Sequence, residues 1–210
     1  MMDPPRLPEW DPGSVAHRTL IRIVHEYRSA GWFGEYEGES DEQVAKTLRE
    51  RWWEENWDDF DPDRMGYGNF SLLDTSRVIA LDPEADASAA NHVYVDVLGR
   101  LASITGDVLD IENVLEDWET ERGRVTVSFD VNGVGRVLHL HQHDDWIDPG
   151  LISGLNSILP DWSRRFYCFD TGGQMYPVTF ATPEEARALN ATGQVLLIDH
   201  APDGWPRAST

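Results

Sequence analysis

The sequence predicts an α+β fold, in which helices pack on a mostly antiparallel sheet built from hairpins and a helical lobe forms the N-terminal part. Apolar residues recur at helical spacing over residues 14–57, and paired strand patterns flank two turns later in the chain. The regular βαβ rhythm and the glycine-rich loop of nucleotide-binding proteins are missing. We expect a helical lobe over residues 1–63, an α+β domain over 64–200 and a loose tail over 201–210.

The N-terminal lobe is predicted to consist of two helices. The first covers residues 14–30, because Ser14 is a favourable cap and apolar residues follow at helical spacing. The second begins after Ser40, which forms a capping-box pattern with Gln43 three residues later. It runs to about residue 57, shortly before an Asp-Pro-Asp sequence that breaks it.

The middle of the chain is predicted to hold a short strand and two helices. Residues 77–81 have the composition of a strand. Residues 91–104 place apolar side chains on one helical face, although the valines there also favour a strand. Residues 110–119 are predicted as a second helix, because their apolar residues are helically spaced. Those residues are Ile111, Val114, Leu115 and Trp118.

The strongest local pattern predicts a hairpin. Polar and apolar residues alternate over residues 124–130, the turn-forming pair Asn132 and Gly133 follows, and a return strand runs to about residue 140. Further elements complete the predicted domain: a helix over 148–159, a hairpin of 166–169 with 176–180, a helix over 182–193 and a strand over 195–198.

The chain carries 38 Asp and Glu against 17 Lys and Arg, a formal net charge of -21 at pH 7. Such a surface repels nucleic acid and anionic lipid, so we expect neither as a partner, and it attracts cationic proteins. Proteome bias, such as adaptation to high salt, is the alternative source of the acidic excess. With a single cysteine, no apolar stretch near the ~20 residues of a membrane span and no secretory pattern, we expect a cytoplasmic protein.

Large aromatic residues and carboxylates coincide near the predicted end of the second helix. Residues 51–61 read Arg-Trp-Trp-Glu-Glu-Asn-Trp-Asp-Asp-Phe-Asp. Aromatic side chains there either pack in the core or, where exposed, anchor a protein interface. The surrounding carboxylates would steer a basic partner toward such an anchor. The predicted partner-binding residues are Trp53, Glu54, Glu55, Trp57, Asp58, Asp59, Phe60 and Asp61.

Histidines alternate along the return strand of the first hairpin. His139, His141 and His143 can share one face of the strand, and Asp145 follows them. The pattern resembles the His-x-His-x-Asp-His motif of metallo-β-lactamases with its last two residues swapped. It also resembles the cupin motif, with Gly133 ahead of the histidines and Asp in place of Glu. Either resemblance implies a Zn or Fe site. The alternative is a strand whose histidines face solvent while Leu138 and Leu140 face the core.

The other reactive groups indicate no particular reaction. Cys168 lies in a predicted strand without a neighbouring base, so we interpret it as a core residue. The acidic run over residues 116–121 is interpreted as a solvated face. We therefore predict no catalytic residue.

A small acidic α+β chain of this kind resembles the immunity proteins that neutralise secreted bacterial toxins, many of which are basic nucleases. The resemblance implies a non-catalytic protein that captures and neutralises a basic protein partner, such as a toxin domain, and needs no cofactor. Two alternatives stay open. One is a metal-dependent hydrolase or oxygenase that uses the histidine cluster with Zn or Fe. The other is a structural or adaptor subunit whose charge provides solubility.

Overall fold

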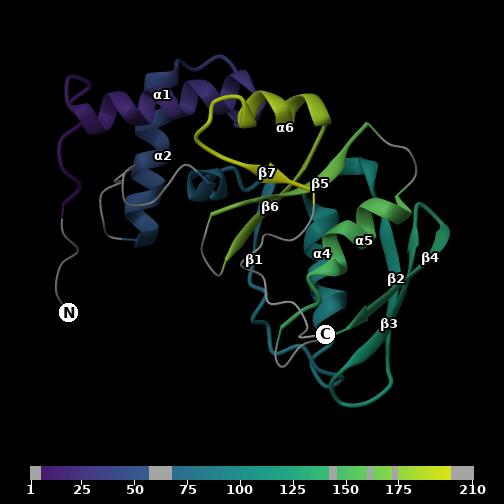
Figure 1. The fold of residues 1–210 in the computed structure, drawn as a ribbon. Helices are drawn as coiled ribbons and strands as arrows, with labels where there is room; N and C mark the ends of the chain where they lie inside the picture. The colour runs from purple at the N-terminus through teal and green to yellow at the C-terminus, as the bar shows by residue number, and fades with distance from the viewer. Residues whose placement is uncertain (1–5, 57–67, 142–145, 160–162, 172–174, 200–210) are drawn as a thin grey trace.

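The computed structural model describes residues 6–56, 68–141, 146–159, 163–171 and 175–199. In this part of the chain it confirms the α+β class, since helices pack on an antiparallel sheet of four strands and another of three (Figure 1). We call these sheet A and sheet B. Short 3₁₀ turns lie in the connections: η1 (Gly34–Tyr36), η2 (Ser71–Leu73) and η3 (Gly106–Val108).

Sheet A separates two hydrophobic clusters. Its strands are β1 (Val78–Leu81), β5 (Arg165–Phe169), β6 (Tyr176–Ala181) and β7 (Leu197–Ile198), in the order β1-β6-β5-β7. Because side chains alternate across a strand, β5 directs Phe166 and Cys168 into one cluster. It directs Tyr167 and Phe169 into the other. Sheet A is therefore an internal layer with a core on each side.

The N-terminal helices contribute to one of these cores. Three helices supply side chains to it: α1 (Val15–Ser29), α2 (Asp41–Asn56) and α6 (Pro183–Asn190). The ring of Tyr27 in α1 lies 6.5 Å from the ring of Phe169 in β5, centroid to centroid. This cluster thus joins residues from the expected N-terminal lobe to the sheet, while the domain boundary expected near residue 63 stays a prediction.

Three predicted helix starts are confirmed by their capping hydrogen bonds. Ser14 Oγ accepts a backbone N–H from the first turn of α1 at 3.2 Å. At the start of α2, the Ser40 backbone donates to the Gln43 side chain at 2.8 Å, and Ser40 Oγ accepts the Gln43 N–H at 3.2 Å. Thr182 and Glu185 form the same reciprocal pair at α6.

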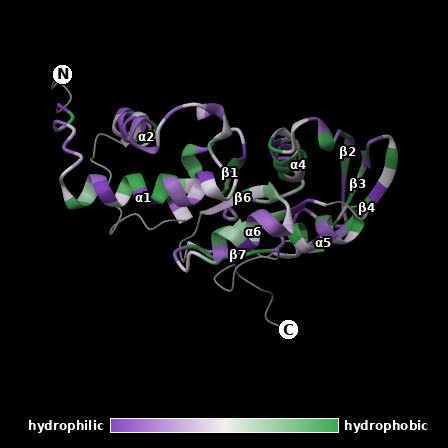
Figure 2. Ribbon diagram, turned by 90° about the horizontal axis from the view of Figure 1, so that it is seen from above, coloured by the Kyte–Doolittle hydropathy of each residue, from purple (hydrophilic) through white to green (hydrophobic). Residues whose placement is uncertain are grey.

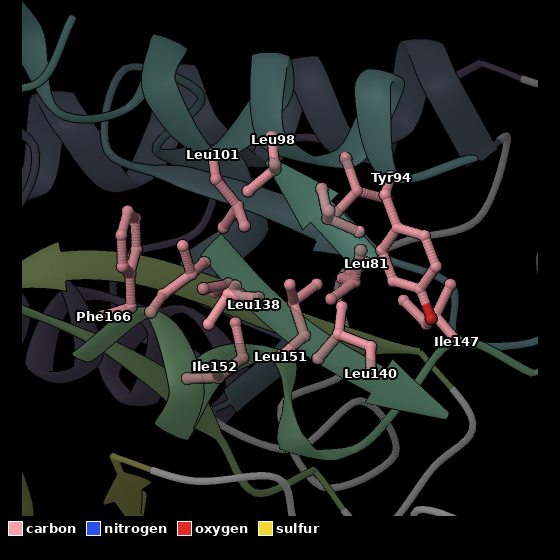
Figure 3. Packing of buried hydrophobic residues seen from close by; sticks show 14 of the residues in the cluster. Leu81, Tyr94, Leu98, Leu101, Leu138, Leu140, Ile147, Leu151, Ile152 and Phe166 are labelled. Atoms are coloured by element: carbon pink, nitrogen blue, oxygen red, sulfur yellow. The ribbon is translucent and has the colours of Figure 1, made fainter. Parts of the chain in front are cut away.

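Sheet B is covered on one side by helices. Its strands are β2 (Ile111–Trp118), β3 (Arg124–Val131) and β4 (Val134–His141), and the helices are α4 (Val93–Ser103) and α5 (Gly150–Ile158). Figure 2 shows sheet B at one end of the molecule, with α4 and α5 on its inner side. In Figure 3, Leu138 and Leu140 of β4 meet Leu151 and Ile152 of α5. These leucines and isoleucine belong to the hydrophobic cluster that also contains Phe166 of β5. The sheet therefore has an inner face and an outer face.

The predicted hairpin of β3 and β4 is confirmed. Asn132 and Gly133 form its turn with positive φ angles of 51° and 75°. Those angles match a type I′ turn, whose twist fits the strands that it joins. The turn places Val131 opposite Val134 and so fixes the register of both strands.

The helix predicted over residues 110–119 is wrong, because this segment is strand β2. Its register with β3 shifts between Glu112 and Leu115, and Asn113 has a positive φ of 53°. A shift of this kind marks a β-bulge, in which one strand carries an extra residue.

The bulge explains why the apolar pattern imitates a helix. Ile111 and Val114 are three residues apart, yet both pack against the inner core because the bulge lies between them. Trp118 follows Val114 by four residues and also packs inward, since ordinary alternation resumes. The helical interpretation placed Leu115 in the core, whereas its side chain is 67% exposed.

The other predicted elements are confirmed. The helices expected over residues 91–104 and 148–159 are α4 and α5, and the second hairpin is β5 with β6. The final strand is confirmed as β7, which is two residues long. None of the helices in the described ranges has both the length and the apolar character required to cross a bilayer.

Candidate functional site

The outer face of sheet B presents side chains to solvent in four cross-strand rows. The register of the three strands fixes these rows. They are Glu112–Asp130–Gly135, Leu115–Ser128–Val137, Asp117–Thr126–His139 and Glu119–Arg124–His141. We use "outer face" for these residues.

The centre of the outer face is apolar. Leu115 is 67% exposed and Val137 is 48% exposed. They stand on either side of Ser128, whose small side chain lies at the floor of a shallow hollow of about 310 Å³. Single exposed apolar residues are ordinary on protein surfaces, whereas apolar residues that gather around one hollow indicate a contact site.

The bulge in β2 creates this arrangement. Asn113, at the bulge, donates from Nδ2 to Asp130 Oδ2 at 2.7 Å and so ties the bulge to strand β3. Because one extra residue reverses the alternation of side chains, the bulge directs Leu115 outward.

The same reversal directs Glu116 inward. Its Oε1 accepts the backbone N–H of Val95 in the first turn of α4 at 2.9 Å, and its Oε2 accepts the indole N–H of Trp118 at 2.8 Å. A carboxylate at the N-terminus of a helix satisfies a backbone donor and opposes the helix dipole. The interpretation of residues 116–121 as a solvated face is therefore wrong for Glu116.

Exposed carboxylates run along β2 and its adjoining loops. In the described part of the chain, none of them forms an ion pair. The nearby Arg122 pairs with Asp86 at 3.1 Å instead. We call these residues the acidic band: Asp107, Asp110, Glu112, Asp117, Glu119 and Glu121.

His139 and His141 lie exposed at the other end of the outer face. The Nδ1 atom of His139 is 3.3 Å from Thr126 Oγ1. The backbone N–H of His141 donates to the carboxylate of Asp148. Together with Arg124, these side chains line a second shallow depression, also of about 310 Å³.

The predicted metal site is described only in part, because His143 and Asp145 lie outside the described residues. Among those described, no three His, Cys, Asp or Glu side chains gather in a way that could hold a metal ion. Leu138 and Leu140, which precede His139 and His141 respectively, are buried. A strand with solvent-facing histidines is therefore confirmed for His139 and His141, and the Zn or Fe site stays a prediction.

The predicted partner-binding segment is also described only in part. At the end of α2, Trp53 is half-buried and Glu54 is exposed. Glu55 belongs to the last turn of the helix, and residues 57–61, from Trp57 to Asp61, lie outside the described ranges. The neighbouring Trp52 packs against the core formed with α1. The segment stays a predicted site.

Cys168 is confirmed as a core residue. It is fully buried in β5. Burial raises the pKa of its thiol to about 12, because the thiolate would lose its solvation. A thiol that stays protonated and inaccessible at neutral pH is a poor nucleophile.

Reasoning from sequence missed the outer face, because it placed Leu115 on an inward helical stripe. The sequence feature that could have indicated this face is the density of carboxylates over residues 107–121. A comparison with protein-family models, curated proteins and solved structures found no match to this chain.

Proposed function

We propose that this chain is a non-catalytic binding protein that captures and neutralises a basic protein partner, in the manner of immunity or inhibitor proteins. The observation that carries the proposal is the acidic band, whose exposed carboxylates lack ion pairs within the described chain. Uncompensated charge on one surface speeds and orients the approach of an oppositely charged protein.

Several basic residues are engaged in contacts within the protein, away from the band. Arg28 Nη1 lies 2.6 Å from Asp41 Oδ1. Arg77 pairs with Glu185 at 3.1 Å, and its guanidinium lies 4.5 Å from the centre of the Trp32 ring. These arginines hold α1, α2, β1 and α6 together and do not neutralise the band. Arg122 and Arg124 lie beside the band, but among the described residues neither forms an ion pair with the band's carboxylates, which outnumber them.

The shape of the outer face also supports a protein partner. Its two hollows are shallow, and the larger part of the face is a broad surface with exposed Leu115 and Val137 near its centre. Small-molecule sites usually enclose most of their ligand. Protein interfaces instead combine an apolar centre with a polar rim.

A basic nuclease would fit this proposal well. Such an enzyme grips phosphates with Lys and Arg, so its substrate groove is positively charged. Carboxylates presented by the acidic band would pair with those groups and compete with the nucleic acid. Neutralisation would then follow from occupancy of the groove and would need no catalysis by this chain.

Capture followed by kinetics tests the proposal. The immobilised chain is exposed to extracts of its source cells, bound proteins are identified, and their association rates are measured over a range of salt. We expect a partner with an isoelectric point above about 9. Its association rate should fall about tenfold or more between about 20 mM and 500 mM salt. A neutral or acidic partner, or a rate that salt does not change, would contradict the proposal.

Two variants that lose the same formal charge separate the effect of the acidic band on the association rate from the effect of total net charge. The band variant carries Asp117→Asn, Glu119→Gln and Glu121→Gln. The control variant carries Glu37→Gln, Glu39→Gln and Glu50→Gln, which are exposed on the N-terminal side of the chain. Both lose the same formal charge. We expect the band variant to associate more slowly than the control, and equal rates would contradict a role for the band.

A further inference from the structure

We infer that the partner docks on the outer face of sheet B, placing an apolar side chain in the hollow between Leu115 and Val137 and its Lys or Arg residues over strand β2. The inference rests on the proposed function. It adds the location of the interface and the chemistry that the partner presents there.

The hollow has the dimensions of a side-chain pocket. Leu115 and Val137 stand two strands apart, and neighbouring strands lie about 4.8 Å apart, so their Cα atoms are separated by about 10 Å. Ser128 stands between them. Asn113 and Asp130 close one end, joined by their 2.7 Å hydrogen bond. One apolar or aromatic side chain fits between two apolar walls in this space.

Charge is distributed unevenly across the face and orients the partner. Strand β2 contributes Glu112 and Asp117, and Glu119 follows the end of the strand, each in a different row. Arg124 stands in the fourth row on β3, and Arg136 of β4 also lines the hollow. Cations placed over Glu112 and Asp117 meet carboxylates in rows that do not contain Arg124, whereas Glu119 stands beside Arg124 in the fourth row. An acidic partner would be repelled along the whole strand.

Docking on the face is favoured over addition of a strand at the β2 edge. Bulges and charged side chains are the features by which edge strands resist pairing with another strand. Strand β2 has both, since its bulge lies between Glu112 and Leu115 and carboxylates flank it. A helix or loop of the partner can therefore meet this surface without extending the sheet.

An NMR titration tests where a cationic, apolar ligand binds. The probe is a short amphipathic peptide of Lys and Leu, compared with one in which Glu replaces Lys and one in which Ser replaces Leu. We expect the Lys–Leu peptide to bind more tightly than both. The largest amide shifts should fall on Leu115, Ser128 and Val137.

Two matched substitutions test the hollow itself. Leu115→Ala removes the apolar wall, and Leu196→Ala removes an equally large side chain that is 49% exposed outside the outer face. Truncating a hot-spot residue at the centre of an interface weakens binding about fivefold or more, which we expect for Leu115→Ala alone. Both positions are exposed, so their melting temperatures should agree closely with that of the unmodified protein and report that the fold is intact.

The outcomes distinguish the docking surface from the proposed function. If the Lys–Leu peptide is preferred but its shifts fall at Trp53 and Glu54, the proposed function stands and the outer face is refuted. If no peptide preference for Lys over Glu appears, both are refuted. If sedimentation shows a dimer that Leu115→Ala dissociates, a second copy occupies the face and the inference is wrong.

Discussion

Replacing Glu116 is the sharpest test of how β2 and α4 support each other. The side chain is half-buried between them and makes two hydrogen bonds, to the Val95 backbone at 2.9 Å and to the Trp118 indole at 2.8 Å. The helix α4 begins at Val93, and its N-cap residue, His92, makes no side-chain capping hydrogen bond. The Val95 N–H also donates to the His92 carbonyl at 3.1 Å, so Glu116 adds a second, charged acceptor from a neighbouring strand.

The expected effect of Glu116→Ala can be summed from its contacts. Loss of a capping acceptor destabilises a protein by about 1 kcal/mol. The charge at the positive end of the helix contributes about 0.3–1 kcal/mol more. The indole N–H of Trp118 loses its partner, which costs about 1 kcal/mol. The unfolding free energy should thus fall by about 2–3 kcal/mol, and the melting temperature by about 4–12 °C for a chain of this size.

Urea unfolding followed by circular dichroism measures the effect. Glu116→Gln keeps a carbonyl acceptor for Val95 and loses the charge and the second acceptor, so it should lower the unfolding free energy by about 1–2 kcal/mol. Asp117→Ala is the control, because the neighbouring carboxylate is exposed on the opposite face and should change the unfolding free energy by less than about 0.5 kcal/mol. Equal losses for Glu116→Ala and Asp117→Ala would refute the capping role.

Two further predictions concern Cys168 and the histidines of β4, His139 and His141. Burial raises the Cys168 pKa from 9.0 to about 12, so above about pH 9 the unfolded chain ionises this thiol while the native chain does not. Unfolding free energy should therefore decline as pH rises from 9 toward 12, more steeply than in Cys168→Ala, and identical slopes would refute the assignment. The metal-enzyme alternative expects stoichiometric Zn or Fe in the purified protein and its loss from a His139→Ala, His141→Ala variant. We expect no metal at stoichiometric level, and elemental analysis decides between the two.

Local chemistry made much of the fold predictable. Helix starts were found because Ser14, Ser40 and Thr182 act within a few residues of their own position. The hairpin was found because Asn132 and Gly133 tolerate the positive φ that its turn requires. These features depend on neighbours in sequence, so they can be read without knowing the rest of the structure.

The candidate site was not predictable in the same way, because it depends on pairing between strands. The apolar spacing of Ile111, Val114 and Trp118 is compatible with a helix and with a bulged strand. Only the pairing of β2 with β3 distinguishes the two. Assigning a helix to this segment places Leu115 in the core instead of on the surface, so the outer face is not recognised.

The bulge links the stability of the protein to its candidate interface. One extra residue between Glu112 and Leu115 directs Glu116 toward α4, where it caps the helix, and directs Leu115 toward solvent. In a strand without the bulge, side chains would alternate regularly. Leu115 would then face the core, and Glu116 would face solvent, away from α4. Exposing a large apolar side chain is unfavourable in isolation. The Asn113 hydrogen bond and the Glu116 cap offset that cost, so Leu115 stays exposed on the outer face.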